Sequence, residues 1–199
     1  MKEKLKKFCF AAVVALVLFH VPQNPLTEAG ISPSFTVEVQ ASTSKVSVSG
    51  KEYYSKAFQV LKKINAVRKK HGKSALVMDK KLLKAAMKRS YEISVYFSHE
   101  RPDGSSWYTI CNTSYGENIA YGQRSASQVV SEWMASPGHK KNILNGSYKS
   151  IGIGVVKING VYYWVQEFGY SKGSKAKAKS YSNKKNLRYV VVDDSIYSD

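Results

Sequence analysis

The chain has almost no cysteine, and it lacks the glycine-rich motif that is typical of nucleotide-binding enzymes. Its 199 residues include only two Cys, and Cys9 lies in an apolar N-terminal run. If that run is removed, Cys111 has no intramolecular partner, so a hydrophobic core must hold the fold together without disulfides. There is no glycine-rich nucleotide motif, and Cys111 has no neighbouring base in sequence, which argues against nucleotide-dependent and thiol-dependent catalysis.

Acidic residues are also scarce: 14 Asp and Glu stand against 31 Lys and Arg, which gives a net charge of +17. Residues 53–170 hold 18 basic and 7 acidic residues (+11), and residues 171–199 hold 7 and 3 (+4). Such an excess favours polyanionic surroundings. Because no groove-entering nucleic-acid motif is present, we expect an anionic cell-wall polymer or a membrane lipid surface as partner, and no specific nucleic acid.

The N-terminus predicts export. Four lysines precede an apolar run from Phe8 to Val21, which is shorter than the roughly 20 residues of a membrane span and is typical of a signal-peptide core. We assign residues 1–29 to a signal peptide, with an end as late as residue 41, and an uncleaved membrane anchor is the alternative. The protein is expected to be secreted or associated with the cell wall.

The remaining chain divides by composition into a linker, a domain and a tail. Residues 30–52 are rich in Ser, Thr and Val and are predicted to be a linker, and residues 171–199 are predicted to be a flexible basic tail. Within that tail, residues 188–192 are a candidate edge strand. Residues 53–170 carry the periodic apolar patterns of one folded domain.

Helical patterns come first in this domain and strand patterns last. Apolar spacing and capping residues predict four helices: one from Tyr54 to Gly72, one after Asp79, one over residues 127–135, and a short one begun by Ser136-Pro137. Two β-patterned runs, 151–158 and 161–168, flank Asn159-Gly160, which is a strong hairpin signal. This order indicates an α+β fold with an antiparallel sheet.

Five segments in a fixed order carry a family resemblance: Ser98–Gly104, Gly116–Ala120, Trp133–Leu144, Gly152–Gly154 and Tyr163–Phe168. Together they resemble the bacterial SCP-like branch of the CAP superfamily, which comprises cysteine-rich secretory proteins, antigen 5 and pathogenesis-related 1 proteins. The resemblance spans the region from Tyr54 to Tyr170. It implies an α-β-α sandwich with a central antiparallel sheet.

The resemblance also implies a cleft in which histidines and carboxylates converge. His99 and His139 match the two family histidines, and Glu117 matches the glutamate of the GEN motif. Animal and plant members carry a further glutamate three residues after the helix tryptophan, where this chain has Ser136. Glu132 stands just before that tryptophan, and we expect it to face elsewhere on the helix.

This set of residues has a catalytic and a structural interpretation. His99, His139 and Glu117 are candidate ligands for zinc or another divalent cation, with an open position for water. The serine at position 136 removes a negative charge and a candidate general base, which weakens a metal site. Alternatively, a buried Glu117 between the histidines is a structural hydrogen-bond hub.

Three functions therefore remain open. The first, which we favour because the family is associated with lipids, sterols and extracellular partners more than with one reaction, is a binding module for a lipid, a sterol-like molecule or another cell-envelope ligand. The second is a metal-assisted hydrolase that uses the cleft of His99, Glu117 and His139. The third is a coat or wall component attached through residues 171–199.

Overall fold

The computed structural model describes residues 42–178 and 183–193. The predicted signal segment and the first part of the predicted linker lie outside these residues. In chain order the elements are β1 (Ser42–Glu52), α1 (Tyr54–Lys70), β2 (Val77–Met78), α2 (Lys80–Val95), a short 3-10 helix (Trp107–Ile110), β3 (Gly116–Tyr121), α3 (Ala126–Ala135), α4 (Pro137–Leu144), β4 (Ser150–Ile158), β5 (Val161–Gly169) and β6 (Lys184–Asp193). Among the helices described, none is long and apolar enough to cross a membrane.

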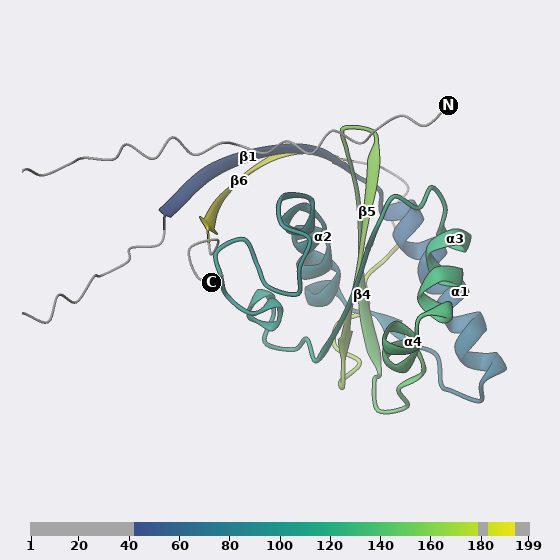
Figure 1. The fold of residues 1–199 in the computed structure, drawn as a ribbon. Coiled ribbons are helices and arrows are strands. Elements are labelled where there is room, and N and C mark those ends of the chain that lie inside the picture. Colours follow the sequence, from purple (N-terminus) through teal and green to yellow (C-terminus); the bar gives the residue numbers. More distant parts are fainter. Residues whose placement is uncertain (1–41, 179–182, 194–199) are drawn as a thin grey trace, which may run out of the picture. The chain divides into compact units, whose positions relative to one another are not determined.

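One sheet separates two helical layers (Figure 1). The strand order is β3-β5-β4-β1-β6 with antiparallel neighbours, while the short β2 pairs with β4 in parallel. Helix α2 lies on one face of β4 and β5, and α1, α3 and α4 lie on the other side. The predicted α+β class, with a largely antiparallel central sheet between helices, is confirmed.

Local signals placed most of these elements correctly. The Asp79 side chain accepts hydrogen bonds from the backbone amides of Lys81 and Leu82 at 2.9 Å and so caps α2, as predicted. Asn159 and Gly160 both have positive φ (48° and 85°), as the tight turn between β4 and β5 requires. Ser136 precedes α4 as predicted, but its hydroxyl makes no capping hydrogen bond, so Pro137 marks that helix start.

The buried face of α1 differs from the one that the large apolar residues indicate. Its fully buried positions are Ala57, Val60, Ile64 and Arg68, whereas Phe58, Leu61 and Val67 are half-buried. The Arg68 guanidinium donates to the carbonyl oxygens of Ser74, Ile143 and Asn145 at 2.6–2.9 Å. These bonds give the inward-facing cation acceptors and tie the end of α1 to the end of α4.

Two glycines of β4 allow α2 to lie directly against the sheet. An added Cβ at Gly152 would lie 2.0 Å from the carbonyl oxygen of Leu82, and one at Gly154 would lie 2.0 Å from that of Ala86. Alternate residues of a strand share a face, and Leu82 and Ala86 are about one helical turn apart. The absence of side chains at these two glycines therefore lets the backbone of α2 pack directly against β4, and we call them the seat glycines.

Strands β1 and β6 form a second cover for α2. They pair over ten register positions, from Ser42 opposite Asp193 to Lys51 opposite Lys184, and we call this pair the β1–β6 ribbon. The ribbon arches past α2 in Figure 1, and the Tyr91 hydroxyl of α2 donates to the carbonyl oxygen of Gly50 at 3.1 Å. The ranges predicted as linker and tail thus contain ordered strands, and the candidate strand at 188–192 lies within β6.

Substitution of a seat glycine tests the close approach of α2 to the sheet. Gly152→Ala should lower the free energy of unfolding by about 3 kcal/mol, because the methyl group meets backbone rather than a side chain that can move aside. Gly138→Ala is the matched control, since nothing lies within 4 Å of its added Cβ in α4. It should leave stability unchanged or raise it by up to about 1 kcal/mol. Equal effects of the two changes in urea unfolding would contradict the tight seat.

Candidate functional site

The predicted cleft residues come from three separate segments. His99 lies in the loop after α2, Glu117 on β3, and His139 in the first turn of α4. Nδ1 of His99 lies 2.8 Å from Oε1 of Glu117. The His99 side chain is 58% exposed and the Glu117 side chain 1% exposed. Glu117 therefore lies at the buried end of the site, and His99 lies at its solvent-exposed end.

Arg89 of α2, which was not predicted as a site residue, forms a buried ion pair with Glu117. Its Nε donates to Oε2 of Glu117 at 2.8 Å, and both side chains are almost fully buried. The same guanidinium donates to the carbonyl oxygens of Ser98 and, at 3.1 Å, Glu100. Arg89 thus neutralises the buried carboxylate and fixes the loop on either side of His99.

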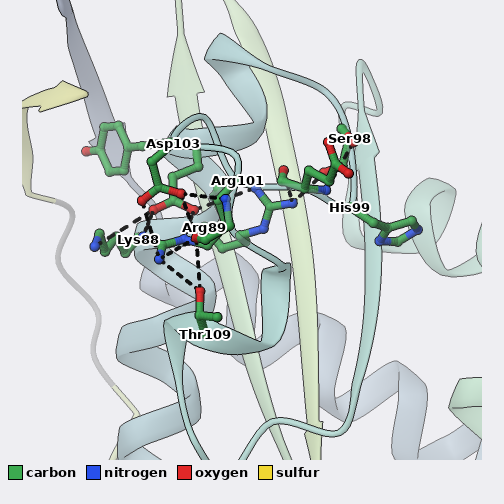
Figure 2. Close-up of polar contacts among 12 residues, drawn as sticks. Lys88, Arg89, Ser98, His99, Arg101, Asp103 and Thr109 are labelled. Carbon is green, nitrogen blue, oxygen red and sulfur yellow. Dashed lines mark hydrogen bonds and ion pairs between the residues drawn. The ribbon is translucent and has the colours of Figure 1, made fainter. Parts of the chain in front are cut away.

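A second ion-paired cluster continues from Arg89 along α2. Glu92 is fully buried and accepts two hydrogen bonds from Arg101, at 2.8 and 3.0 Å, while Arg89 lies 3.6 Å from it. Figure 2 shows Arg89 and Arg101 lying between Lys88 on one side and His99 on the other. Arg101 follows His99 by two residues, so the Glu92–Arg101 pair fixes the part of the loop that comes after His99.

Glu167 of β5 lies opposite Glu117 in the sheet register, and it too was missed as a site residue. Burial raises its pKa well above the ordinary value of 4.5, and the adjacent Glu117 carboxylate raises it further. The Ser114 hydroxyl donates to Oε2 of Glu167. Of the two facing carboxyl groups, Glu167 is thus the one whose surroundings favour the protonated form.

An amide network positions His139. The Asn142 side chain donates to the Glu117 carbonyl oxygen at 3.1 Å and to Oδ1 of Asn118 at 2.9 Å. Asn118 donates in turn to the His139 carbonyl oxygen at 3.2 Å. These bonds join α4 to β3, so the second histidine is placed by the strand that carries Glu117. Burial lowers the pKa of His139, and the nearby His99 lowers it further by a smaller amount, so the surroundings favour the neutral ring.

His99, Ser136 and His139 line one open groove of about 590 Å³, which we call the histidine groove. Its other lining residues are Phe97, Ser98, Ile119, Ala120, Tyr121, Gln123, Glu132 and Trp133. The rings of Phe97 and Tyr121 meet edge to face with centroids 4.7 Å apart, and they are 47% and 54% exposed. The groove thus combines an aromatic rim with hydrogen-bonding groups.

The expectation that Glu132 faces elsewhere on its helix is wrong. Glu132 lines the histidine groove together with Ser136, because residues four apart on a helix lie one above the other. The prediction compared Glu132 with its neighbour Trp133, whereas the relevant comparison is with Ser136, four residues further on. The Glu132 carboxylate accepts hydrogen bonds from Gln123 at 2.5 Å and Gln128 at 3.0 Å. A carboxylate is therefore present at the groove rim, held by two amides.

The side chains as they lie do not fit a zinc site. Within residues 42–178 and 183–193, no three His, Cys, Asp or Glu side chains gather where they could hold a metal ion. Both Glu117 oxygens accept hydrogen bonds: Oε2 from Arg89 at 2.8 Å, and Oε1 from His99 at 2.8 Å and from Arg89 at 3.4 Å. Metal binding by His99, Glu117 and His139 would require these bonds to be broken, and it stays a prediction.

The Arg89–Glu117 pair should be critical for stability. Glu117→Gln keeps the shape of the side chain but leaves the Arg89 charge without its closest partner, since Glu92 lies 3.6 Å from Arg89. We expect a loss of about 3 kcal/mol in the free energy of unfolding, as for other broken buried pairs. Urea unfolding at pH 7 measures it, and a loss below about 1 kcal/mol would contradict the pairing.

Unlike Glu117→Gln, the substitution Glu167→Gln should cost little stability at neutral pH, because glutamine resembles the protonated acid. The unfolded chain releases the Glu167 proton near its ordinary pKa, whereas the folded chain keeps it to higher pH. Wild-type stability therefore falls as the pH rises through that window, by at most about 1.4 kcal/mol per pH unit from this group. The variant should have a flatter profile of unfolding free energy as the pH rises above 4.5. Parallel profiles would show that Glu167 ionises normally.

Comparison with known proteins agrees with the geometry. The model of the cysteine-rich secretory protein (CAP) family matches residues 61–168. The uncharacterized protein YkwD of Bacillus subtilis (strain 168) is 35% identical over 154 residues, which make up 73% of this chain and 56% of that protein. The match thus spans little more than half of this curated relative.

Two solved structures share the fold. An extracellular protein containing a SCP domain from Bacillus anthracis str. Ames is 24% identical, with a TM-score of 0.55 over 60% of this chain and 41% of that one. An outer surface protein from Borrelia burgdorferi is 19% identical, with a TM-score of 0.50 over 61% of this chain and 94% of that one. From the family match, the order of its motifs and the sandwich that they build, this chain belongs to the CAP family of cysteine-rich secretory proteins.

Proposed function

We propose that this CAP-family chain is an exported binding module whose histidine groove takes a component of the bacterial cell envelope. The observation that carries the proposal is the state of Glu117. Its two oxygens are bonded to Arg89 and His99 at 2.8 Å, beneath the surface. A carboxylate held in this way serves to position His99 and is poorly placed to take a proton from a substrate or water.

The lining of the groove suits a ligand with both an apolar face and hydrogen-bonding groups. Phe97 and Tyr121 offer exposed rings at the rim, and such rings stack against flat apolar surfaces. His139 and Gln123, which line the same groove, offer polar atoms. A wall saccharide has this combination, whereas a lipid chain or a sterol-like molecule would use the rings alone. We therefore place the saccharide first among the envelope ligands.

The expected location supports the same function. Two proteins of the same fold are described as an extracellular protein and an outer surface protein, and the predicted signal segment would export this chain in the same way. Removal of that segment would leave a secreted or wall-associated domain. Its retention would anchor the same domain at the membrane.

The metal-assisted hydrolase is the runner-up. It needs His99 and His139 as ligands, and both do line the histidine groove. It also needs Glu117 as a third ligand or a base, and that carboxylate would first have to leave a buried guanidinium. Breaking such a buried pair costs about 3–5 kcal/mol, which a metal ion would have to offset before any gain in affinity.

A groove variant tests the binding function. Phe97→Ala/Tyr121→Ala removes both rim rings and should weaken binding of soluble peptidoglycan fragments about tenfold, because stacked rings each contribute about 0.5–1.5 kcal/mol. Tyr170→Ala is the matched control, since Tyr170 is similarly exposed (49%) but does not line this groove.

Isothermal titration calorimetry would measure the affinities for these fragments and for phospholipid vesicles. Binding of the fragments that is lost in the double variant and kept in the control supports the proposal. Failure of the wild-type protein to bind fragments, or equal losses in the two variants, would contradict it. Binding of vesicles alone would move the ligand class to lipid.

A further inference from the structure

Helix α2 exposes only lysines. It is buried against the sheet on one side and covered by the β1–β6 ribbon on another, so ten of its sixteen residues are buried. The four exposed positions are Lys80, Lys81, Lys84 and Lys88. Three of them, Lys80, Lys84 and Lys88, follow one another at four-residue steps and form a straight row along the helix.

Two more lysines face this row across a groove. One hollow of about 560 Å³ is lined by Lys80, Lys84, Lys177 and Lys185, and an adjoining one of about 200 Å³ by Lys84, Lys88 and Lys185. We call the two together the lysine groove. Lys185 belongs to β6, so the β1–β6 ribbon supplies the opposite wall. The groove lies apart from the histidine groove, with which it shares no lining residue.

The positive charge of the lysine groove is largely uncompensated. Lys185 pairs with Glu52 at 2.8 Å, and Lys88 lies 3.8 Å from the buried Glu92. Within the described ranges, Lys80, Lys84 and Lys177 form no ion pair. A cleft lined by charges of one sign concentrates the field and attracts the opposite charge.

The residues between the two walls of the lysine groove, which form its floor, limit the classes of anionic ligand that fit it. The aliphatic residues that line the groove are Leu83, Met87, Ala176 and Leu187, of which Leu187 is half-buried and the other three are 2–7% exposed. The aromatic residues that line the groove, Tyr54 and Tyr91, are 9% and 0% exposed, so the bases of a nucleic acid would find no open ring to stack on. A flat membrane surface would not reach the floor between the two walls.

We infer that the lysine groove binds a linear polymer of phosphodiesters joined by short aliphatic units, as in the polyol-phosphate polymers of a cell wall. Its phosphates match a row of lysines, and its methylene groups match the apolar floor. Charged contacts of this kind release counterions, so binding weakens as salt rises. The inference needs from the proposed function only that the chain is exported, because the two grooves are separate.

The test compares two variants of the full chain with equal net charge. Lys80→Gln/Lys84→Gln/Lys177→Gln removes three cations from the lysine groove. Lys62→Gln/Lys69→Gln/Lys73→Gln removes three exposed lysines in and after α1, away from the groove. Thermal melting checks that both variants fold. Affinity for purified poly(glycerol phosphate) is measured at several salt concentrations.

The groove variant should lose about tenfold or more in affinity, and the slope of its salt dependence should fall by roughly one for each phosphate contact removed. The control should stay within about twofold of the wild type. Equal losses in the two variants would mean that net charge alone attracts the polymer, and would overturn the inference. Single-stranded DNA or anionic phospholipid vesicles that depend more strongly than the polymer on the three groove lysines would also overturn it.

A further measurement separates this inference from the proposed function. Phe97→Ala/Tyr121→Ala should bind poly(glycerol phosphate) as the wild type does, because the rim rings belong to the histidine groove. Loss of polymer binding in that variant would mean that the polymer occupies the histidine groove, and would overturn the separate site.

Discussion

The ion pair between Arg89 and Glu117 is the contact on which the rest of the site depends. It joins α2 to β3 in the interior, and 28 residues of sequence separate the two partners. The same guanidinium fixes the loop around His99, and Glu117 fixes the His99 ring. Glu167 lies opposite Glu117 in the sheet, and burial together with the Glu117 carboxylate raises its pKa.

Glu132 bears on the fourth cleft position that the family resemblance implies. Ser136, directly after α3, stands where the resemblance implies a carboxylate, while Glu132 places one about a turn earlier at the same groove. Because Glu132 is held by Gln123 and Gln128 rather than by the histidines, it adds polarity to the rim without completing a metal site. The histidine groove and the lysine groove share no lining residue, so the two proposed binding functions do not compete for the same surface.

The sequence predicted those features that depend on neighbouring residues. The Asp79 cap, the Asn159-Gly160 turn and the Pro137 helix start each follow from local chemistry, and the order of motifs located His99, Glu117 and His139. Arg89 had a usable signal, since it occupies an inward position between Ala86 and Ile93, where a cation needs a buried carboxylate. The pairing of Glu117 with Glu167 depends on strand register, and the β1–β6 ribbon joins segments more than 130 residues apart. No local pattern specifies such contacts.

Glu117 is bonded to Arg89 and His99, and we therefore expect it to be unavailable to a metal or a substrate. Because the carboxylate accepts hydrogen bonds, Nδ1 should be the protonated ring nitrogen of His99. Nitrogen-15 NMR of the two histidine rings during a zinc titration measures this directly. We expect a protonated Nδ1 on His99 and no stoichiometric shift of either ring as zinc is added. Saturation of both rings at one equivalent of zinc, with loss of the Nδ1 proton signal, would contradict it.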